Sequence, residues 1–288
     1  MSVPKNHHYV SQCQIKKFFN KEEGKVYVYN KETKRIQYRR SSEKLYSEDE
    51  SNSRFINNKI DHQTLEDDLN KHFEHDFNKH FQMLEEAINI KSFTPEFKDA
   101  VSFFTKYGIA GYIRPPSKKS ELDNKLKSSL LKVYGETSNE GKHILDLFSQ
   151  TKHSNKIIYS EFSEKVYSAM GDVNAVLYSI VSDDFFLLPD LPSITKREKI
   201  NEYFNPDVKE IAMVGIPLSS KIFLNAESSK YRKYNDRISY LSAKRTSVIN
   251  RINYSLYLHA HKEVACENKK YLENFIQNIS VFESTIEF

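Results

Sequence analysis

The chain has 288 residues, of which 39% are hydrophobic and 28% are charged. This mixture is that of an ordinary globular protein and excludes a disordered chain, which carries fewer apolar residues. The formal net charge is only +4, so attraction of a polyanion requires the basic residues to be segregated on one surface. No apolar run approaches the roughly 18 residues of a membrane span, and the first residues lack the apolar segment of an export signal. Because Cys13 and Cys266 also lack the paired spacing of a disulfide framework or a zinc site, we expect a cytoplasmic protein with no membrane partner.

The first predicted elements are a short helix and a hairpin. Apolar side chains recur at helical spacing in residues 12–19, and turn-forming residues follow them. Residues 26–38 contain two runs of β-favouring side chains around a polar turn, which predicts a β-hairpin. Residues 41–58 are polar, and we expect them to form a loop.

Residues 62–90 form the clearest predicted helix, because large apolar side chains recur there at every third or fourth position. These side chains are Leu65, Leu69, Phe73, Phe77, Phe81, Leu84 and Ile88. Thr94 has the residue type of a helix N-cap and is followed by proline, so a second helix is predicted over residues 95–112. Two further helices are predicted over residues 122–134 and 141–148.

Strand-like patterns then appear in the second half of the chain. Four short apolar or β-branched runs, bounded by Asp, Pro and Ser, predict a small antiparallel sheet: residues 173–181, 185–188, 210–214 and 222–224. Apolar residues on one face predict a helix over residues 238–252, and a closing helix is predicted over residues 271–279. The chain is therefore expected to be a single domain over residues 1–288 with a helix-rich α+β fold, an N-terminal hairpin and a small antiparallel sheet.

Histidines provide two weak candidate sites, since no strong catalytic motif is present. His7 and His8 could supply a general base, a phosphate-orienting donor or metal nitrogens; the alternative is a solvated N-terminal tail. His72, Asp76 and His80 are spaced by four, which on a helix is compatible with a divalent metal. The alternative is the polar shoulder of an amphipathic helix, so the cofactor stays unknown, with a divalent metal as one candidate.

Asp190 is a third candidate. It follows the apolar run 185–188 and precedes Leu191 and Pro192, which places a carboxylate at the end of a predicted strand. Functional side chains are often positioned in this way on a rigid scaffold. The alternative is an aspartate that only caps a turn before proline.

Basic residues are concentrated between residues 227 and 251, with tyrosines between them. Such a cluster can neutralise phosphates while the rings stack on bases. The predicted nucleic-acid contacts are Lys230, Arg232, Lys233, Lys244 and Arg245, and the cluster also includes Arg237 and Arg251. The alternative is the solvated face of a helix.

Several short segments, in order along the chain, carry a resemblance to a known family. They are His7-His8-Tyr9-Val10-Ser11-Gln12, Phe18-Phe19, Leu65-Glu66, Glu74, Ile113-Arg114-Pro115, Phe185 to Pro192, Ile216-Pro217-Leu218-Ser219, Asn253 and Ala260. The chain resembles the bacterial family catalogued as domain of unknown function 4238. In this sequence Ser11 stands where the family usually has proline, and Leu188-Pro189-Asp190-Leu191-Pro192 replaces the commoner Thr-Ser-Asp-Asn-Pro.

The resemblance implies one group of candidate catalytic residues and a role in a bacterial accessory or defence system. The group consists of His7, His8, Glu66, Arg114, Asp190 and Asn253. One hypothesis is a phosphodiester-cleaving enzyme of the nuclease type, with His7 or His8 as general base, Asp190 as an orienting or metal-binding carboxylate and Arg114 on the phosphate. The other is a non-catalytic module that binds nucleic acid or protein, in which the same residues form a polar structural network. An enzyme requires them around an open cleft, whereas the second hypothesis requires them buried and mutually hydrogen-bonded.

Overall fold

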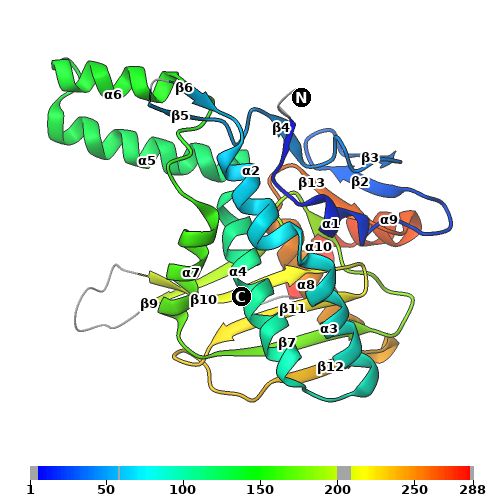
Figure 1. Ribbon diagram of the computed structural model, residues 1–288. Helices are drawn as coiled ribbons and strands as arrows, with labels where there is room; N and C mark the ends of the chain where they lie inside the picture. Colours follow the sequence, from blue (N-terminus) through cyan, green and yellow to red (C-terminus); the bar gives the residue numbers. More distant parts are fainter. Residues whose placement is uncertain (1–5, 58, 200–208, 286–288) are drawn as a thin grey trace.

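The computed structural model describes residues 6–57, 59–199 and 209–285 (Figure 1). Residues 1–5, part of the segment considered above as an export signal, therefore lie outside the described residues. Figure 1 shows helices packed against a central sheet, a second small sheet near the N-terminus, and a pair of helices, α5 (Pro116–Tyr134) and α6 (Asn139–Ser149), that extends away from the body. The predicted α+β class is confirmed.

The central sheet has five strands in the order β12-β7-β11-β10-β9. Their bounds are β7 (Val173–Ile180), β9 (Ile194–Lys199), β10 (Lys209–Pro217), β11 (Ile222–Ser228) and β12 (Arg237–Leu241). All neighbours are antiparallel except β12, which pairs parallel to β7. The prediction of a helix starting at residue 238 was therefore wrong, because the free edge of β7 offers backbone hydrogen bonds that a local apolar pattern does not reveal.

Both faces of this sheet are buried, which explains its nearly continuous apolar runs. In β11, Ile222 and Leu224 face one core and Phe223 faces the other, as side chains alternate along a strand. The first core lies under α3 (Phe77–Ile90), α4 (Pro95–Ile113) and α7 (Tyr159–Met170), and the second lies under α8 (Thr246–His259) and α9 (Lys269–Gln277). A Cβ on Gly108 would lie 2.6 Å from a methyl carbon of Val214, so α4 approaches β10 closely only because this residue is glycine.

The second sheet has the order β3-β2-β13-β8. Its strands are β2 (Val26–Asn30), β3 (Arg35–Arg39), β8 (Leu188–Pro189) and β13 (Glu263–Cys266). The sheet lies beside α1 (Gln12–Lys16) and α9 (Figure 1), whereas α10 (Ile279–Thr285) packs on α8 and α9. The predicted hairpin is confirmed as β2 and β3. The strand predicted over residues 185–188 was wrong, since only Leu188 belongs to a strand and this strand, β8, pairs with β13 in the second sheet. The backbone N–H groups of Phe186 and Leu187 are bound instead by Ser220 and by the Asn253 side chain.

The long helix predicted over residues 62–90 is divided into α2 (Thr64–Leu69), a π-helix (Asn70–Glu74) and α3. Its apolar stripe is buried as expected. Each four-residue step along an α-helix overshoots a full turn by about 40°, so a stripe that repeats every fourth residue rotates away from the core. The wider π turn corrects this rotation and keeps Phe73 and Phe77 facing the core.

The polar residues 41–58, predicted to form a loop, contain two short strands. β4 (Ser47–Asp49) pairs with β1 (Asn6–His8), and β5 (Arg54–Ile56) pairs with β6 (Lys59–Asp61). The prediction failed there because strands of three residues are too short to show an alternating apolar signal. Among the helices of the described residues, none combines the length and the apolar character needed to cross a membrane.

Candidate functional site

The two N-terminal histidines lie inside the fold rather than in a solvated tail. Strand β1 pairs antiparallel with β4, and this pairing holds His7 and His8 against the body of the protein. His7 is 1% exposed, and its Nδ1 accepts a hydrogen bond of 2.8 Å from the backbone N–H of Asn52. The Nε2 of the half-buried His8 lies 3.0 Å from the carbonyl of Ser42, and because a carbonyl only accepts, this nitrogen donates. The alternative of a solvated N-terminal tail is therefore wrong for these two residues.

Arg114 is buried beside the same strand. Its Nη2 donates to the carbonyl oxygen of His8 at 2.6 Å and lies 3.3 Å from Oε1 of Glu74. The side chain is 2% exposed. The guanidinium therefore fastens β1 to the π-helix that carries Glu74.

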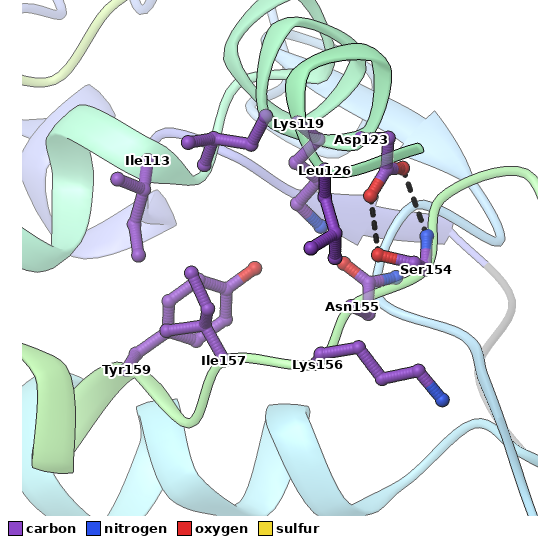
Figure 2. Close-up of a pocket in the computed structure, with 10 residues that line it drawn as sticks. Ile113, Lys119, Asp123, Leu126, Ser154, Asn155, Lys156, Ile157 and Tyr159 are labelled. Carbon is purple, nitrogen blue, oxygen red and sulfur yellow. Dashed lines mark hydrogen bonds between the residues drawn. The ribbon is translucent and has the colours of Figure 1, made fainter. Parts of the chain in front are cut away.

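Glu66 belongs to a polar network centred on Asn52. The side-chain nitrogen of Asn52 donates to Glu66, and its Oδ1 accepts a hydrogen bond of 2.9 Å from the Tyr159 hydroxyl. Lys119 donates to the same oxygen, and burial lowers the pKa of this lysine to about 7. Figure 2 shows Lys119 and Tyr159 beside a cavity of about 70 Å³ with largely apolar walls. The network ties the segment after β4 to α5 and α7.

Asn253 is fully buried on α8, and both the oxygen and the nitrogen of its side-chain amide form hydrogen bonds. Its Oδ1 accepts from the N–H of Leu187 at 3.0 Å. Its Nδ2 donates to the carbonyl of Phe185 at 2.7 Å and to the Tyr271 hydroxyl at 3.0 Å. This side chain holds the segment that leads into β8 and Asp190.

Asp190 accepts three backbone hydrogen bonds from residues 261–263, where the chain enters β13. Its Oδ1 lies 2.7 Å from the N–H of His261, and its Oδ2 lies 2.7 Å from that of Lys262 and 3.1 Å from that of Glu263. Burial raises the pKa of the Asp190 carboxyl, although the three N–H groups favour its charged form. The carboxylate thus fixes the 261–263 segment beside β8.

Asp190 also lines a cleft of about 630 Å³ to which distant parts of the chain contribute. The lining residues are Tyr9, Arg39, residues 44–48, Pro115, Pro116, Ser117, Ser120, Lys152, His153, Asp190 and residues 261–263. The N-terminal motif thus reaches this cleft through Tyr9. Burial, followed by the charges of Asp190, Glu263 and Glu48, raises the pKa of Tyr9, so its hydroxyl stays protonated.

Glu48 and His153 form an ion-pair geometry within this cleft. The Nε2 of His153 lies 3.2 Å from Oε2 of Glu48, whose other oxygen lies 2.6 Å from the amino group of Lys152. Because a carboxylate only accepts, Nε2 carries the proton and Nδ1 of the neutral ring keeps a lone pair. His153 is 4% exposed, and its Nδ1 has no hydrogen-bond partner among the described residues. Burial lowers the pKa of His153, which favours the neutral ring near pH 7.

The helix α5 begins at the edge of the same cleft. Its first turn contains no acidic residue, and its cap residue, Pro115, makes no side-chain hydrogen bond to the helix. Ser117 and Ser120 of this turn line the cleft. The positive end of a 19-residue helix therefore faces the space beside His153.

Each of the three carboxylates in the cleft wall accepts hydrogen bonds from the protein. Glu48 and Asp190 do so as described, and Oε1 of Glu263 accepts from the Asn30 amide at 3.1 Å. The basic side chains Arg39 and Lys44 have no carboxylate within ion-pair distance in the described ranges. The cleft therefore combines carboxylates that already accept hydrogen bonds from the protein with basic side chains that have no acidic partner among the described residues.

The comparison with known proteins identifies the family. The profile of the family described as protein of unknown function (DUF4238) matches residues 6–270. The chain belongs to this family. No curated protein and no solved structure matches the chain.

Three of the segments that carry the DUF4238 resemblance meet around Gln14 of α1. Its Nε2 donates to the carbonyls of Pro192 at 3.1 Å and Pro217 at 2.7 Å, and its Oε1 accepts from the Tyr107 hydroxyl at 2.7 Å. Ser11, which stands where the family usually has proline, caps α1 and lies 2.8 Å from the same hydroxyl. These bonds join the N-terminus to the loops that follow β8 and β10.

Sequence reasoning missed Glu48 and His153, the pair whose geometry is best suited to acid–base chemistry. The two residues are 105 positions apart and belong to no spaced motif. Glu48 lies in the segment predicted to be a loop, and His153 lies between two helices. Only the histidine residue type itself could have indicated a candidate.

The histidines predicted as metal ligands do not converge. Nε2 of His72 lies 3.9 Å from Asp68, whereas the ring of His80 stacks on Phe103 with 4.0 Å between centroids. The π turn between them removes the simple four-residue stacking on one face. Within residues 6–57, 59–199 and 209–285, no three His, Cys, Asp or Glu side chains are grouped closely enough to hold a metal ion.

The five predicted nucleic-acid contacts fall at the two ends of β12. Lys230, Arg232 and Lys233 precede the strand, and Lys230 lies 3.7 Å from Glu210 while also donating to the carbonyl of Ala169. Lys244 and Arg245 follow the strand in a short 3-10 helix and are exposed. The segment is therefore two separate basic surfaces rather than the face of one helix.

Proposed function

We propose that the protein cleaves phosphodiester bonds in the cleft that contains Glu48 and His153, with His153 as the general base. The observation that carries the proposal is the buried Nδ1 of His153, which lacks a hydrogen-bond partner among the described residues. Buried polar atoms are normally paired, so an unpaired lone pair on a residue that lines the cleft is a candidate for function. Glu48 is the positioning residue, because its carboxylate fixes the tautomer that leaves Nδ1 basic.

The cleft also supplies groups that suit a phosphate. The N-terminal turn of α5 presents its positive end and two hydroxyls, from Ser117 and Ser120. Arg39 and Lys44 add charge at the rim. Such donors stabilise the charge that develops on the phosphoryl oxygens during displacement.

In the proposed reaction, Nδ1 of His153 takes a proton from a water molecule as the water oxygen attacks phosphorus. The bond to the leaving oxygen breaks, and that oxygen takes a proton from solvent in the open cleft. The imidazolium formed on His153 is stabilised by Glu48 and returns its proton to solvent. No step depends on a metal ion or on a cofactor.

The residues implied by the family resemblance receive supporting roles in this proposal. Asp190 and Asn253 hold one wall of the cleft, and Arg114, His7 and Glu66 hold the wall formed by β1, β4 and the following turn. His8 stays near the site through its bond to Ser42. The proposal assigns the activity to the cytoplasm, where Cys13 and Cys266 would remain thiols.

A second candidate function is a non-catalytic module that binds nucleic acid. It is favoured by one observation: the hydrogen-bonding groups of Asn253 and Asp190 are occupied by the protein itself, as expected of a structural network. Under this hypothesis the cleft binds phosphate but does not turn it over. The two functions therefore differ in product formation rather than in binding.

The test measures hydrolysis of bis(p-nitrophenyl) phosphate and of labelled single-stranded DNA and RNA by the full chain. His153→Ala should reduce kcat/KM by about 10²–10⁴-fold, the usual contribution of general-base catalysis. Glu48→Gln should lower kcat more than it raises KM, because the misassigned tautomer still permits binding. The matched control is His143→Ala, since His143 is exposed on α6 and does not line the cleft.

Melting curves accompany each assay, because His153→Ala also removes the hydrogen bond to Glu48. Hydrolysis by His153→Ala at the rate of the parent and of the control would eliminate the proposed base. Binding of oligonucleotides with no product from the parent would instead support the non-catalytic module.

A further inference from the structure

A second concave surface lies near the N-terminal end of α8, where β12 leads into the helix. It is a groove of about 510 Å³ at the open edge of the central sheet. Its lining residues are Tyr178, Arg237, Ile238, Ser239, Tyr240, Leu241, Arg245, Val248 and Arg251. The groove shares no lining residue with the cleft that contains His153.

The three arginines give this groove a single sign of charge. No Asp or Glu lines it, and all three side chains are exposed. The buried arginine of the fold, Arg114, is instead paired with an acid. Among the described residues, no ion pair to a carboxylate involves Arg237, Arg245 or Arg251.

Neighbouring acids are occupied elsewhere. Asp236, which precedes the first arginine of the groove, pairs with Lys98 and accepts a hydrogen bond of 2.8 Å from the N–H of Ala175. The Arg245 guanidinium lies 3.3 Å from the hydroxyl of Ser239, a neutral partner. Guanidinium groups without acidic partners around a hollow form a fork-like site that matches phosphate.

Two tyrosines supply flat surfaces beside these charges. The Tyr240 hydroxyl donates to the carbonyl of Ile88 at 2.6 Å, which fixes its ring at the groove. Tyr178 packs against Phe223 with 6.3 Å between ring centroids. Rings held in this way can stack on unpaired bases, which a duplex does not expose.

We infer that the groove formed by β12 and the start of α8 binds the phosphate backbone of a single-stranded nucleic acid. The three arginines contact phosphates, and Tyr178 and Tyr240 contact bases. This inference rests on the proposed function in one respect: the single strand bound in the groove is the substrate that the cleft cleaves. Binding in the groove does not require that the cleft be catalytic.

The groove can be altered without touching the cleft. The helix α8 has 14 residues and is therefore about 21 Å long. Arg245 and Arg251 belong to its N-terminal side, whereas the cleft residues His261 to Glu263 follow its C-terminal end. Truncation of exposed arginines at one end should leave the clamp on Asp190 at the other end intact.

The test is fluorescence anisotropy with a short labelled single-stranded DNA of mixed sequence and with its duplex, over a range of salt concentrations. The double variant Arg245→Ala/Arg251→Ala should weaken single-strand binding by about tenfold and reduce the slope of log K against log salt by about 1.4, or 0.7 per lost phosphate contact. The matched control is Arg35→Ala, since Arg35 is exposed on β3 and lines neither the groove nor the cleft.

Several results would overturn the inference. They are unchanged affinity and slope in the double variant, equal weakening in Arg35→Ala, tighter binding of the duplex than of the single strand, and no binding by the parent. Groove-dependent binding without hydrolysis would sustain this inference and reject catalysis in the cleft. Hydrolysis that is independent of the arginines would do the reverse.

Discussion

Replacing Asp190 by asparagine distinguishes a structural carboxylate from a chemical one. The two side chains have nearly the same shape, but asparagine presents one acceptor oxygen and one donor nitrogen. In the parent, Oδ1 accepts one backbone N–H and Oδ2 accepts two. The best orientation for asparagine keeps its oxygen on the N–H groups of Lys262 and Glu263 and turns its NH₂ group toward the N–H of His261.

The expected cost follows from this count. One part-buried N–H loses its acceptor, which costs about 1–3 kcal/mol, and two charge-assisted bonds become neutral ones. Relief of the buried charge offsets part of this loss, since burial already raises the pKa of Asp190. We expect a net loss of about 2–3 kcal/mol in the free energy of unfolding, which lowers Tm by about 3–5 °C in a chain of this size.

The assay compares thermal melting of the parent with that of Asp190→Asn and Asp183→Asn. Asp183 is exposed seven residues earlier, so its replacement should change stability by less than about 0.5 kcal/mol. Activity of Asp190→Asn is measured well below its Tm. A variant that melts with the parent but has lost all activity would refute the structural reasoning and assign the carboxylate to chemistry.

Three further outcomes are expected. Because burial lowers the pKa of His153 from its ordinary value of 6.5, kcat/KM should rise with pH to a plateau with a midpoint below 6.5, which a pH-rate profile checks. The unfolded chain binds this proton more readily than the folded chain, so stability should fall as pH drops through 6.5, and melting profiles should show a smaller fall in His153→Gln. Asn253→Ala should lose about 2–4 kcal/mol in chemical denaturation, because three partners lose their hydrogen bonds, whereas Asn250→Ala on the same helix should lose little. Gly108→Val should destabilise the fold by about 3 kcal/mol, seen as a lower urea midpoint, because a Cβ already collides with Val214; a parent-like midpoint would contradict the close packing of α4 on β10.

Elements with a strong local signal could be predicted from the sequence. The side chain of Thr94 accepts from the N–H of Phe97 at 3.3 Å and α4 begins at Pro95, as the residue types at these positions indicate. The hairpin of β2 and β3 forms around its polar turn. The family was also recognisable, because short segments in a fixed order are carried by the sequence alone.

Elements that depend on distant partners could not be predicted in this way. Residues 238–241 have apolar spacing that suits a helix, but the edge of β7 recruits them into a parallel pair. β13 has only four residues and is a strand because β2 and β8 lie on either side of it. A short segment takes the conformation that satisfies its backbone hydrogen bonds in context, and this context is non-local.

The candidate site shows the same division. The sequence by itself determined the residue types of the N-terminal motif and of Asp190, which proved to be neighbours of one cleft. Only the tertiary structure decided that Arg114 and Asn253 would be buried in backbone hydrogen bonds, and that Glu48 would meet His153 across 105 residues. The reactivity of a side chain depends on distances, burial and unpaired lone pairs, and these are properties of the packed chain rather than of the order of its residues.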